Sequence, residues 1–261
     1  MLSKATLQLI RSLDTRKGRR AHGLFVAEGP RLVGELLGHF RCQKLFYTPT
    51  SAHEAWLQAL RGAVPADACC PLTEQELERA SLQQSPQGVL ALLHIPTSDT
   101  DAAAAADTQL CLALDGVQDP GNLGTIVRLA DWFGVEDIFC SPDCCDIWNP
   151  KAVQATMGGL ARVRVHYLNL PAWLHALPAD VPVYGTSLQG SSIWQAPLQQ
   201  RGVIVMGNEG RGVSPEVAAL CRQQLLIPNH PAGRPTTESL NVAMATAITL
   251  AEFRRRGAAE R

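Results

Sequence analysis

Short apolar segments alternate along the chain with segments whose apolar positions recur every three or four residues. The first pattern is typical of β-strands and the second of amphipathic helices. In the N-terminal part of the chain, the expected strands are 24–27, 45–48 and 89–93. Serine caps a helix start and proline fits a first turn. Helices are therefore expected from Ser3 toward Arg16, from Pro30 onward, and over 53–60 and 73–80. Residues 1–96 predict a small α/β domain.

The same alternation resumes after residues 97–108, a polar stretch that follows Pro96 and contains a run of alanines but no apolar face. That composition is typical of a linker. Residues 110–114 then form a continuous apolar run, as expected for a strand buried on both faces of a parallel sheet. Further strands are expected at 137–140, 163–165, 183–186, 203–206 and 225–227, with helices at 126–133 and from 240 to about 256. Residues 109–261 therefore predict a second α/β domain with a mostly parallel sheet.

The composition suits a protein with two buried cores, because 46% of the 261 residues are hydrophobic and 18% are charged. No apolar run approaches the roughly 20 residues that span a bilayer, and no long apolar segment marks a secretory signal near the start. The eight cysteines are scattered or adjacent, and none forms a CxxC pair. We therefore expect a cytoplasmic protein with reduced thiols and no metal site.

Basic residues gather at the start of the chain although the net charge is only −1. Residues 1–20 contain Asp14 as their single acid, beside Lys4, Arg11, Arg16, Lys17, Arg19 and Arg20. A local basic patch is expected of a surface that contacts phosphates, and Arg16, Lys17, Arg19 and Arg20 are the candidate contacts to the phosphates of a nucleic acid. A solvated helical tail remains an equal alternative on charge alone. A mitochondrial transit segment is disfavoured, because Asp14 interrupts the patch and no amphipathic, cleavable stretch is visible.

Three loops of small and polar residues follow expected strands of the C-terminal domain, at 119–128, 207–212 and 238–243. Loops beyond the carboxyl ends of parallel strands bind ligands, since unpaired backbone groups and helix N-termini meet there. Three such loops predict one shared pocket. The glycine spacings of a dinucleotide-binding site and of a P-loop are both absent.

Each loop offers candidate chemistry. Gly121 and Gly124 flank Asn122 and allow a ligand to approach the backbone, and Arg128 follows one turn later on the expected helix. Glu209 lies between glycines, where a tight turn alone does not explain a carboxylate. Ser239 and Asn241 both suit the N-cap of the last helix. The candidate catalytic residues are therefore Asn122, Arg128, Glu209, Ser239 and Asn241.

Together these loops resemble the three motifs of the SpoU (TrmH-type) RNA 2′-O-methyltransferases of the SPOUT superfamily. Asn122, Gly124 and Arg128 match the first motif, N-x-G-x-x-x-R, while 207–210 match the second and 239–242 the third. The resemblance runs from about residue 110 to residue 253. Residues 23–33 also resemble the L30e-like substrate-binding domain that many members carry.

The resemblance implies a deep trefoil knot in the C-terminal domain and S-adenosyl-L-methionine as cofactor. Carried over residue by residue, it places cofactor contacts at Thr186, Gly207, Ile227 and Leu240. It further implies a homodimer through this domain and structured RNA as substrate, for which we expect ribosomal RNA. A transfer-RNA methyltransferase of the same fold is the alternative, and a non-catalytic RNA-binding protein that kept the fold is another.

Roles follow from the chemistry of methyl transfer. Arg128 is expected to stabilise the negative charge that develops on the ribose oxygen, because a guanidinium is a poor proton acceptor. Asn122, Ser239 and Asn241 are expected to orient the nucleotide and Arg128, and Glu209 to fix the loops or a substrate group.

Two stretches depart from the family pattern. Gln154 stands where members commonly have arginine, which weakens the case for an RNA contact there. The loop 229–238 is longer than usual, and its His230 and Arg234 either contact RNA or belong to a surface insertion.

Overall fold

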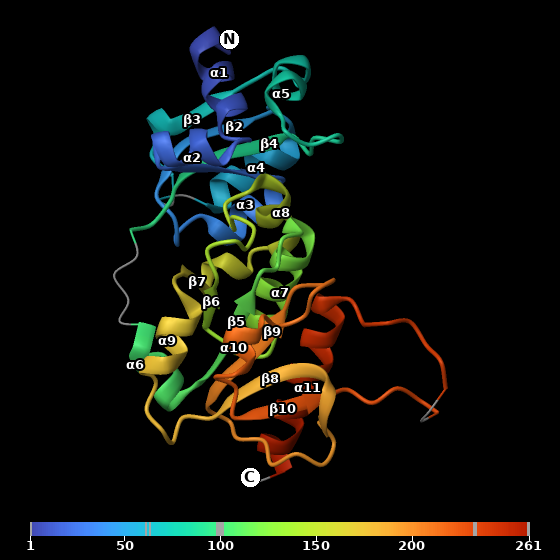
Figure 1. Cartoon of the computed structure of the whole chain (residues 1–261). Helices are drawn as coiled ribbons and strands as arrows, with labels where there is room; N and C mark the ends of the chain where they lie inside the picture. The colour runs from blue at the N-terminus through green and yellow to red at the C-terminus, as the bar shows by residue number, and fades with distance from the viewer. Residues whose placement is uncertain (1, 61, 63, 98–101, 232–233, 260–261) are drawn as a thin grey trace. The chain divides into compact units, whose positions relative to one another are not determined.

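The computed structural model describes residues 2–60, 62, 64–97, 102–231 and 234–259 (Figure 1). The chain forms two compact units. Unit 1 comprises Met1–Thr97 and Asp146–Ala161, and unit 2 comprises Ser98–Cys145 and Arg162–Arg261. Residues 146–161, expected within the C-terminal domain, thus belong to the unit of the N-terminal residues.

Unit 1 is built on a mixed sheet with the strand order β1-β4-β2-β3. β4 pairs antiparallel with β1 and β2, and β3 pairs parallel with β2. The strands are β1 Leu24–Glu28, β2 Cys42–Tyr47, β3 Cys69–Pro71 and β4 Val89–His94. The helices are α1 Lys4–Ser12, α2 Arg16–His22, α3 Pro30–Leu36, α4 Ser51–Ala59, α5 Glu74–Ala80 and α8 Pro150–Thr156, with 3-10 turns η1 Ala66–Ala68 and η2 Gly159–Ala161.

Most helix starts in unit 1 follow the sequence signals. The hydroxyl of Ser3 accepts a hydrogen bond from Thr6 N at 3.0 Å, and Pro30 occupies the first turn of α3, as predicted. The helix expected to run from Ser3 toward Arg16 instead ends at Ser12, and Thr15 caps a separate helix, α2. The strand β3 was not predicted.

The segment Asp146–Ala161 joins unit 1 through an aromatic cluster and polar contacts. The Trp148 ring lies 4.7 Å from the Phe25 ring and 5.9 Å from the Phe40 ring, centroid to centroid. Gln83 Nε2 donates to Gln154 Oε1 at 2.7 Å. Gln154 therefore contacts a side chain of its own unit.

Unit 2 contains a six-stranded sheet in the order β10-β8-β9-β5-β6-β7, and every neighbouring pair is parallel. The predicted α/β class with a mostly parallel sheet is confirmed. The strands are β5 Leu110–Asp115, β6 Asp137–Cys140, β7 Arg164–Tyr167, β8 Val183–Ser192, β9 Gly202–Gly207 and β10 Gln223–Leu226. The helices are α6 Ala102–Thr108, α7 Pro120–Trp132, α9 Leu170–Ala176, α10 Pro215–Ala218 and α11 Val242–Ala259. The last helix, α11, packs against α7 and β9, and the trefoil knot stays an expectation.

Part of the expected linker is helical. Residues 102–108 form α6, and Ala106 is fully buried in the same core cluster as Cys111 and Val203. The alanine run lacks large apolar side chains, but alanine has the highest helix propensity and its methyl group can be buried. The prediction of a linker over 102–108 was therefore wrong, and residues 98–101 lie outside the described residues. Among the helices described, none is long and apolar enough to cross a bilayer.

Candidate active site

A cavity of about 600 Å³ lies in unit 2, lined by the ends of β8, β9 and β10 and by residues before and within α11. The parallel strands bring these segments to one edge of the sheet. Two of the three loops predicted to share a pocket, 207–212 and 238–243, line this cavity, whereas no residue of 119–128 does. All four expected cofactor contacts line this cavity: Thr186, Gly207, Ile227 and Leu240. Glu209 and Ser239 line it as well.

The loop after β9 is a tight turn that requires glycine at its start. Asn208 and Gly212 exchange two backbone hydrogen bonds of 3.0 and 2.8 Å. A Cβ on Gly207 would lie 2.2 Å from backbone atoms of Gly212 and Val213, so no other residue fits. Asn208 Oδ1 accepts from Gly210 N and its Nδ2 donates to Gly116 O at 2.7 Å. The turn is thereby tied to the loop that follows β5, and Glu209 is held at its tip.

A chain of side-chain hydrogen bonds joins the three motif loops. Asn122 Nδ2 donates to Glu209 Oε1 at 2.8 Å, and Asn241 Nδ2 donates to Asn122 Oδ1 at 3.0 Å. Asn241 Oδ1 in turn accepts from Ala243 N at 2.9 Å, which caps α11. The three side chains from distant parts of the sequence form one connected site.

The other two candidate catalytic residues lie differently. Arg128 is exposed on α7, makes no hydrogen bond or ion pair with the residues that the structure describes, and does not line the cavity. Of the two expected capping groups, Asn241 caps α11, whereas Ser239 lines the cavity. The structure therefore brings Asn122, Glu209 and Asn241 together and leaves the guanidinium of Arg128 available to a ligand.

A second polar cluster adjoins the turn after β9, and it was not predicted. Arg211 Nη2 lies 4.0 Å from Asp143 Oδ2. Ser141 Oγ donates to Asp143 Oδ1 at 2.5 Å and accepts from Gly116 N at 2.9 Å. A cation between Gly210 and Gly212 in the second motif was the sequence signal that could have pointed to Arg211.

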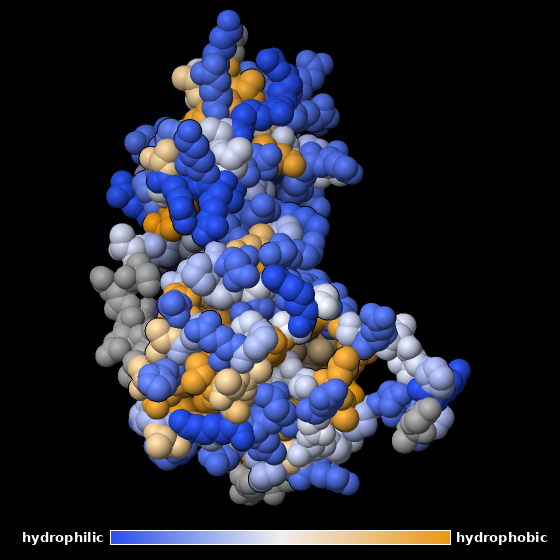
Figure 2. All heavy atoms as spheres, viewed as in Figure 1, coloured by the Kyte–Doolittle hydropathy of each residue, from blue (hydrophilic) through white to orange (hydrophobic). Residues whose placement is uncertain are grey.

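The four candidate RNA contacts on α2 divide into two kinds. Arg16, Lys17 and Arg20 are exposed, and Figure 2 shows a strongly hydrophilic surface around α2. Arg19 is only 2% exposed, its Nη2 lies 2.6 Å from Asp146 Oδ2, and its Nη1 donates to Leu13 O at 2.8 Å. The prediction that Arg19 contacts RNA is therefore corrected, because its guanidinium is buried and bonded to Asp146 and Leu13 inside unit 1.

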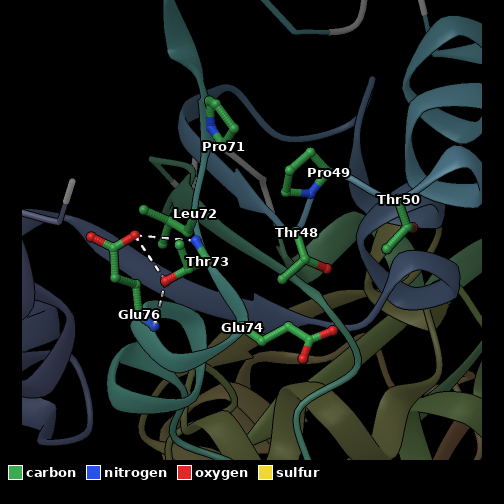
Figure 3. Close-up of a pocket in the computed structure, with 8 residues that line it drawn as sticks. All are labelled: Thr48, Pro49, Thr50, Pro71, Leu72, Thr73, Glu74 and Glu76. Atoms are coloured by element: carbon green, nitrogen blue, oxygen red, sulfur yellow. Dashed lines mark hydrogen bonds between the residues drawn. The ribbon is translucent and has the colours of Figure 1, made fainter.

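A smaller cavity of about 380 Å³ lies in unit 1 beyond the ends of β2 and β3 (Figure 3). Three of its polar side chains are engaged in capping: Glu76 turns back to accept from Thr73 N at 3.1 Å, Thr73 Oγ1 accepts from Glu76 N at 3.3 Å, and Thr50 Oγ1 accepts from His53 N at 3.3 Å. These contacts explain the hydroxyls without a ligand.

The loop 229–238 runs outward from unit 2 (Figure 1), with residues 232–233 outside the described part. Its His230 and Arg234 are exposed, and Asn229 Nδ2 donates to Arg234 O at 3.0 Å. Elsewhere, no three His, Cys, Asp or Glu side chains of the described residues gather in a way that could hold a metal ion.

A parallel α/β sheet with these three joined motifs at its carboxyl edge defines the class of RNA methyltransferases that the sequence resembles. Residues 109–251 match the SpoU rRNA Methylase family, and residues 4–91 match the MRM3-like substrate binding domain. The chain belongs to the SpoU rRNA methylase family, which confirms the resemblance drawn from the motifs.

Relatives extend over almost the whole chain. The 23S rRNA guanosine-2′-O-methyltransferase RlmP of Bacillus subtilis is 30% identical, with 94% of each chain covered. A TrmH-family protein from Porphyromonas gingivalis is 42% identical and superposes with a TM-score of 0.86, over 98% of this chain and 99% of the other. The AdoMet-bound rRNA methyltransferase of Sinorhizobium meliloti is 29% identical with a TM-score of 0.80, over 98% and 96% of the two chains.

Proposed function

We propose that the protein transfers the methyl group of S-adenosyl-L-methionine to a ribose 2′-hydroxyl of ribosomal RNA. The observation that carries this proposal is the chain Asn241–Asn122–Glu209, which joins the three motifs beside one cavity. A relative that aligns over 94% of each chain is named for 2′-O-methylation of 23S rRNA. Intact polar residues at every motif position disfavour a non-catalytic RNA-binding protein.

The cavity fits the cofactor by size and lining. Its volume of about 600 Å³ lies within the range of small-molecule pockets. Ile227 and Leu240 offer apolar surface for a flat base, Thr186 offers a hydroxyl, and Gly207 leaves the backbone accessible. The bound cofactor supplies an electrophilic methyl group on a positively charged sulfur.

Methyl transfer of this kind is an in-line displacement, so the chain must position the ribose and stabilise the charge on its oxygen. Arg128 suits the second task, because its guanidinium is always charged and has no partner among the described residues. Asn122 and Asn241 hold the loops in register, and Ser239 offers a hydroxyl at the cavity to orient the nucleotide.

A homodimer through unit 2 accounts for two features of its surface. Trp132 on α7 is 83% exposed and Met244 on α11 is 57% exposed, although both are large and apolar. Arg128 lies one turn before Trp132 on α7, outside the cavity lining of its own chain. A second copy packed on this face would bury both side chains and complete the site around Arg128.

We favour ribosomal RNA over transfer RNA as the substrate, because a relative named for ribosomal RNA matches more of this chain than a structure described for transfer-RNA methylation does. RlmP matches 94% of this chain, so the match includes the N-terminal residues. A structure of an enzyme for 2-OH methylation of C/U34 on tRNA covers only 58% of this chain, at a TM-score of 0.51. The exposed Arg16, Lys17 and Arg20 are basic groups of unit 1 suited to phosphates. A cytoplasmic location agrees with the eight cysteines, none of which forms a disulfide within the described part of the chain.

The test is to map 2′-O-methyl groups in RNA from cells with and without the protein. Loss of one ribosomal RNA methylation on deletion, restored by the wild-type gene, supports the proposal. Unchanged ribosomal RNA together with a lost transfer-RNA methylation would contradict the substrate, and no lost methylation at all would contradict the activity.

A further inference from the structure

We infer that Glu209 is the proton acceptor for the ribose 2′-hydroxyl. This inference rests on the proposed function and assigns a step that its other residues leave open. Arg128 stabilises negative charge, but an arginine cannot take up the proton because its side chain is already fully protonated.

The proton balance of the reaction requires an acceptor. A lone pair of the 2′ oxygen forms the new O–CH₃ bond, and the electrons of the S–CH₃ bond stay on sulfur, which becomes a neutral thioether. The electrons of the O–H bond stay on oxygen, and the proton passes to a carboxylate oxygen of Glu209. No further reagent is consumed, and the proton leaves to solvent after the product does.

The lining of the cavity offers few alternatives. Among the described residues that line it, the carboxylates are Glu209 and Glu238 and the cation is Arg211, with no His, Lys, Cys or Tyr. Glu238 lies in the exposed loop before α11, whereas Glu209 lies in the turn after β9, which backbone hydrogen bonds between Asn208 and Gly212 close. A carboxylate held in such a turn suits a general base, because the acceptor must be within hydrogen-bond reach of the proton.

The hydrogen-bond chain orients Glu209 for this task. The backbone N–H of Ala243 fixes Asn241 Oδ1 as an acceptor, so Asn241 presents its N–H to Asn122. Asn122 therefore uses its Oδ1 as acceptor and presents its own N–H to Glu209 Oε1. The other oxygen, Oε2, accepts no hydrogen bond from the described residues and remains available to a hydroxyl.

The neighbouring cation does not pair with Glu209. Arg211 lies two residues further along the turn, and the carboxylate nearest to its guanidinium is that of Asp143, at 4.0 Å. An ion pair with Arg211 would favour the charged carboxylate and make it a weaker proton acceptor. Among the residues that the structure describes, the neutral amide of Asn122 is the one group that forms a hydrogen bond with the Glu209 carboxylate.

The decisive variant is Glu209→Gln, because the glutamine carbonyl oxygen can still accept from Asn122 but its amide cannot take up a proton. Single-turnover methylation should be measured at saturating cofactor and RNA. We expect a rate lower by about two to four orders of magnitude, the usual contribution of a general base, with cofactor and RNA dissociation constants within a few-fold of wild type. Glu216→Gln, an exposed carboxylate on α10 outside the cavity, is the matched control and should keep the wild-type rate.

A near-wild-type rate in Glu209→Gln would overturn the inference, since it would show that only an acceptor for Asn122 is needed. A large loss of rate in Glu238→Gln instead would assign the step to the other carboxylate.

If Glu209→Gln lowers the melting temperature, the proton acceptor is tested with Glu209→Ala and added formate. Recovery of rate with formate supports the inference, and a folded variant without recovery overturns it. If the wild type itself methylates no ribose, the proposed function fails, which this assay separates from a failure at Glu209.

Discussion

Asn241 and Asn122 lie 119 positions apart in the chain, yet Asn241 Nδ2 donates to Asn122 Oδ1 at 3.0 Å. The same Asn241 caps α11 through its Oδ1. Asn241 therefore both caps α11 and connects the third motif to the first, and different substitutions can separate these two functions.

Asn241→Asp should keep the cap, because aspartate is as good an N-cap as asparagine. It should lose the bond to Asn122, because an ionised carboxylate cannot donate. We expect thermal stability near wild type and turnover lower by about tenfold, the scale of one hydrogen bond. Asn241→Ala should lose both functions, with about 1 kcal/mol less stability as well. Equal activity of Asn241→Asp and wild type would show that the bond between the two asparagines is dispensable.

Arg128→Ala should leave the fold and cofactor affinity near wild type, because Arg128 is exposed and forms no hydrogen bond or ion pair with the described residues. Its single-turnover rate should fall by roughly two to three orders of magnitude, the scale of losing one charge-stabilising group. Arg128→Lys keeps the charge and should retain part of the rate. A wild-type rate in Arg128→Ala would remove this residue from the reaction.

Several local features were predictable from sequence because they depend on neighbouring residues alone. Ser3, Pro30 and the apolar run of β5 all follow from capping, proline geometry and burial on both sheet faces. The strand β3 is too short for periodicity to reveal, and it ends in Pro71. For the helix α6, the absence of large apolar side chains predicts a linker, but alanine favours helices.

Features that depend on distant partners could not be predicted in this way. Arg19 belongs to a basic stretch that looks exposed, but Asp146, which pairs with it, lies 127 positions away. The sequence motifs predicted that Asn122, Glu209 and Asn241 lie in one site. Which of these side chains donates each hydrogen bond and which accepts it could be seen only in the structure.

Charge reversal on α2 should separate RNA capture from catalysis. Changing Arg16, Lys17 and Arg20 together to Glu should weaken RNA binding and flatten its salt dependence. Each lost phosphate contact should remove about 0.7–0.9 from the slope of log K against log salt. Cofactor binding should stay unchanged, and titrations at several salt concentrations measure both. Wild-type affinity and slope in this variant would make α2 a solvated helix only.

Arg19→Ala should instead lower the free energy of unfolding. Loss of one partner of a buried ion pair typically costs about 3–5 kcal/mol, and the Arg19–Asp146 pair lies inside unit 1. Denaturant unfolding measures the loss, and an unchanged midpoint would contradict it.

Acid should destabilise unit 2 through Asp137. Burial opposes ionisation of this carboxyl, but hydrogen bonds from His166 and Arg164 outweigh it and lower its pKa to about 2. Since an unfolded aspartate titrates near ~3.9, the ionised carboxylate stabilises the fold above that pH. We expect about 2 kcal/mol to be lost as the pH falls from about 4 to about 2. Urea unfolding should show a weaker pH dependence in Asp137→Asn than in the control Glu136→Gln, and parallel curves would contradict the assignment.

The proposed methyl acceptor is a ribose oxygen. To test this acceptor, the target nucleotide of a methylated RNA fragment is replaced with its 2′-deoxy counterpart, and the nucleosides are analysed by mass spectrometry. We expect a 2′-O-methyl nucleoside from the natural fragment, no methylation of the deoxy fragment, and only modestly weaker binding of the deoxy fragment, since phosphates and RNA shape supply most of the affinity. Methyl transfer to the base, or to the deoxy fragment, would contradict it.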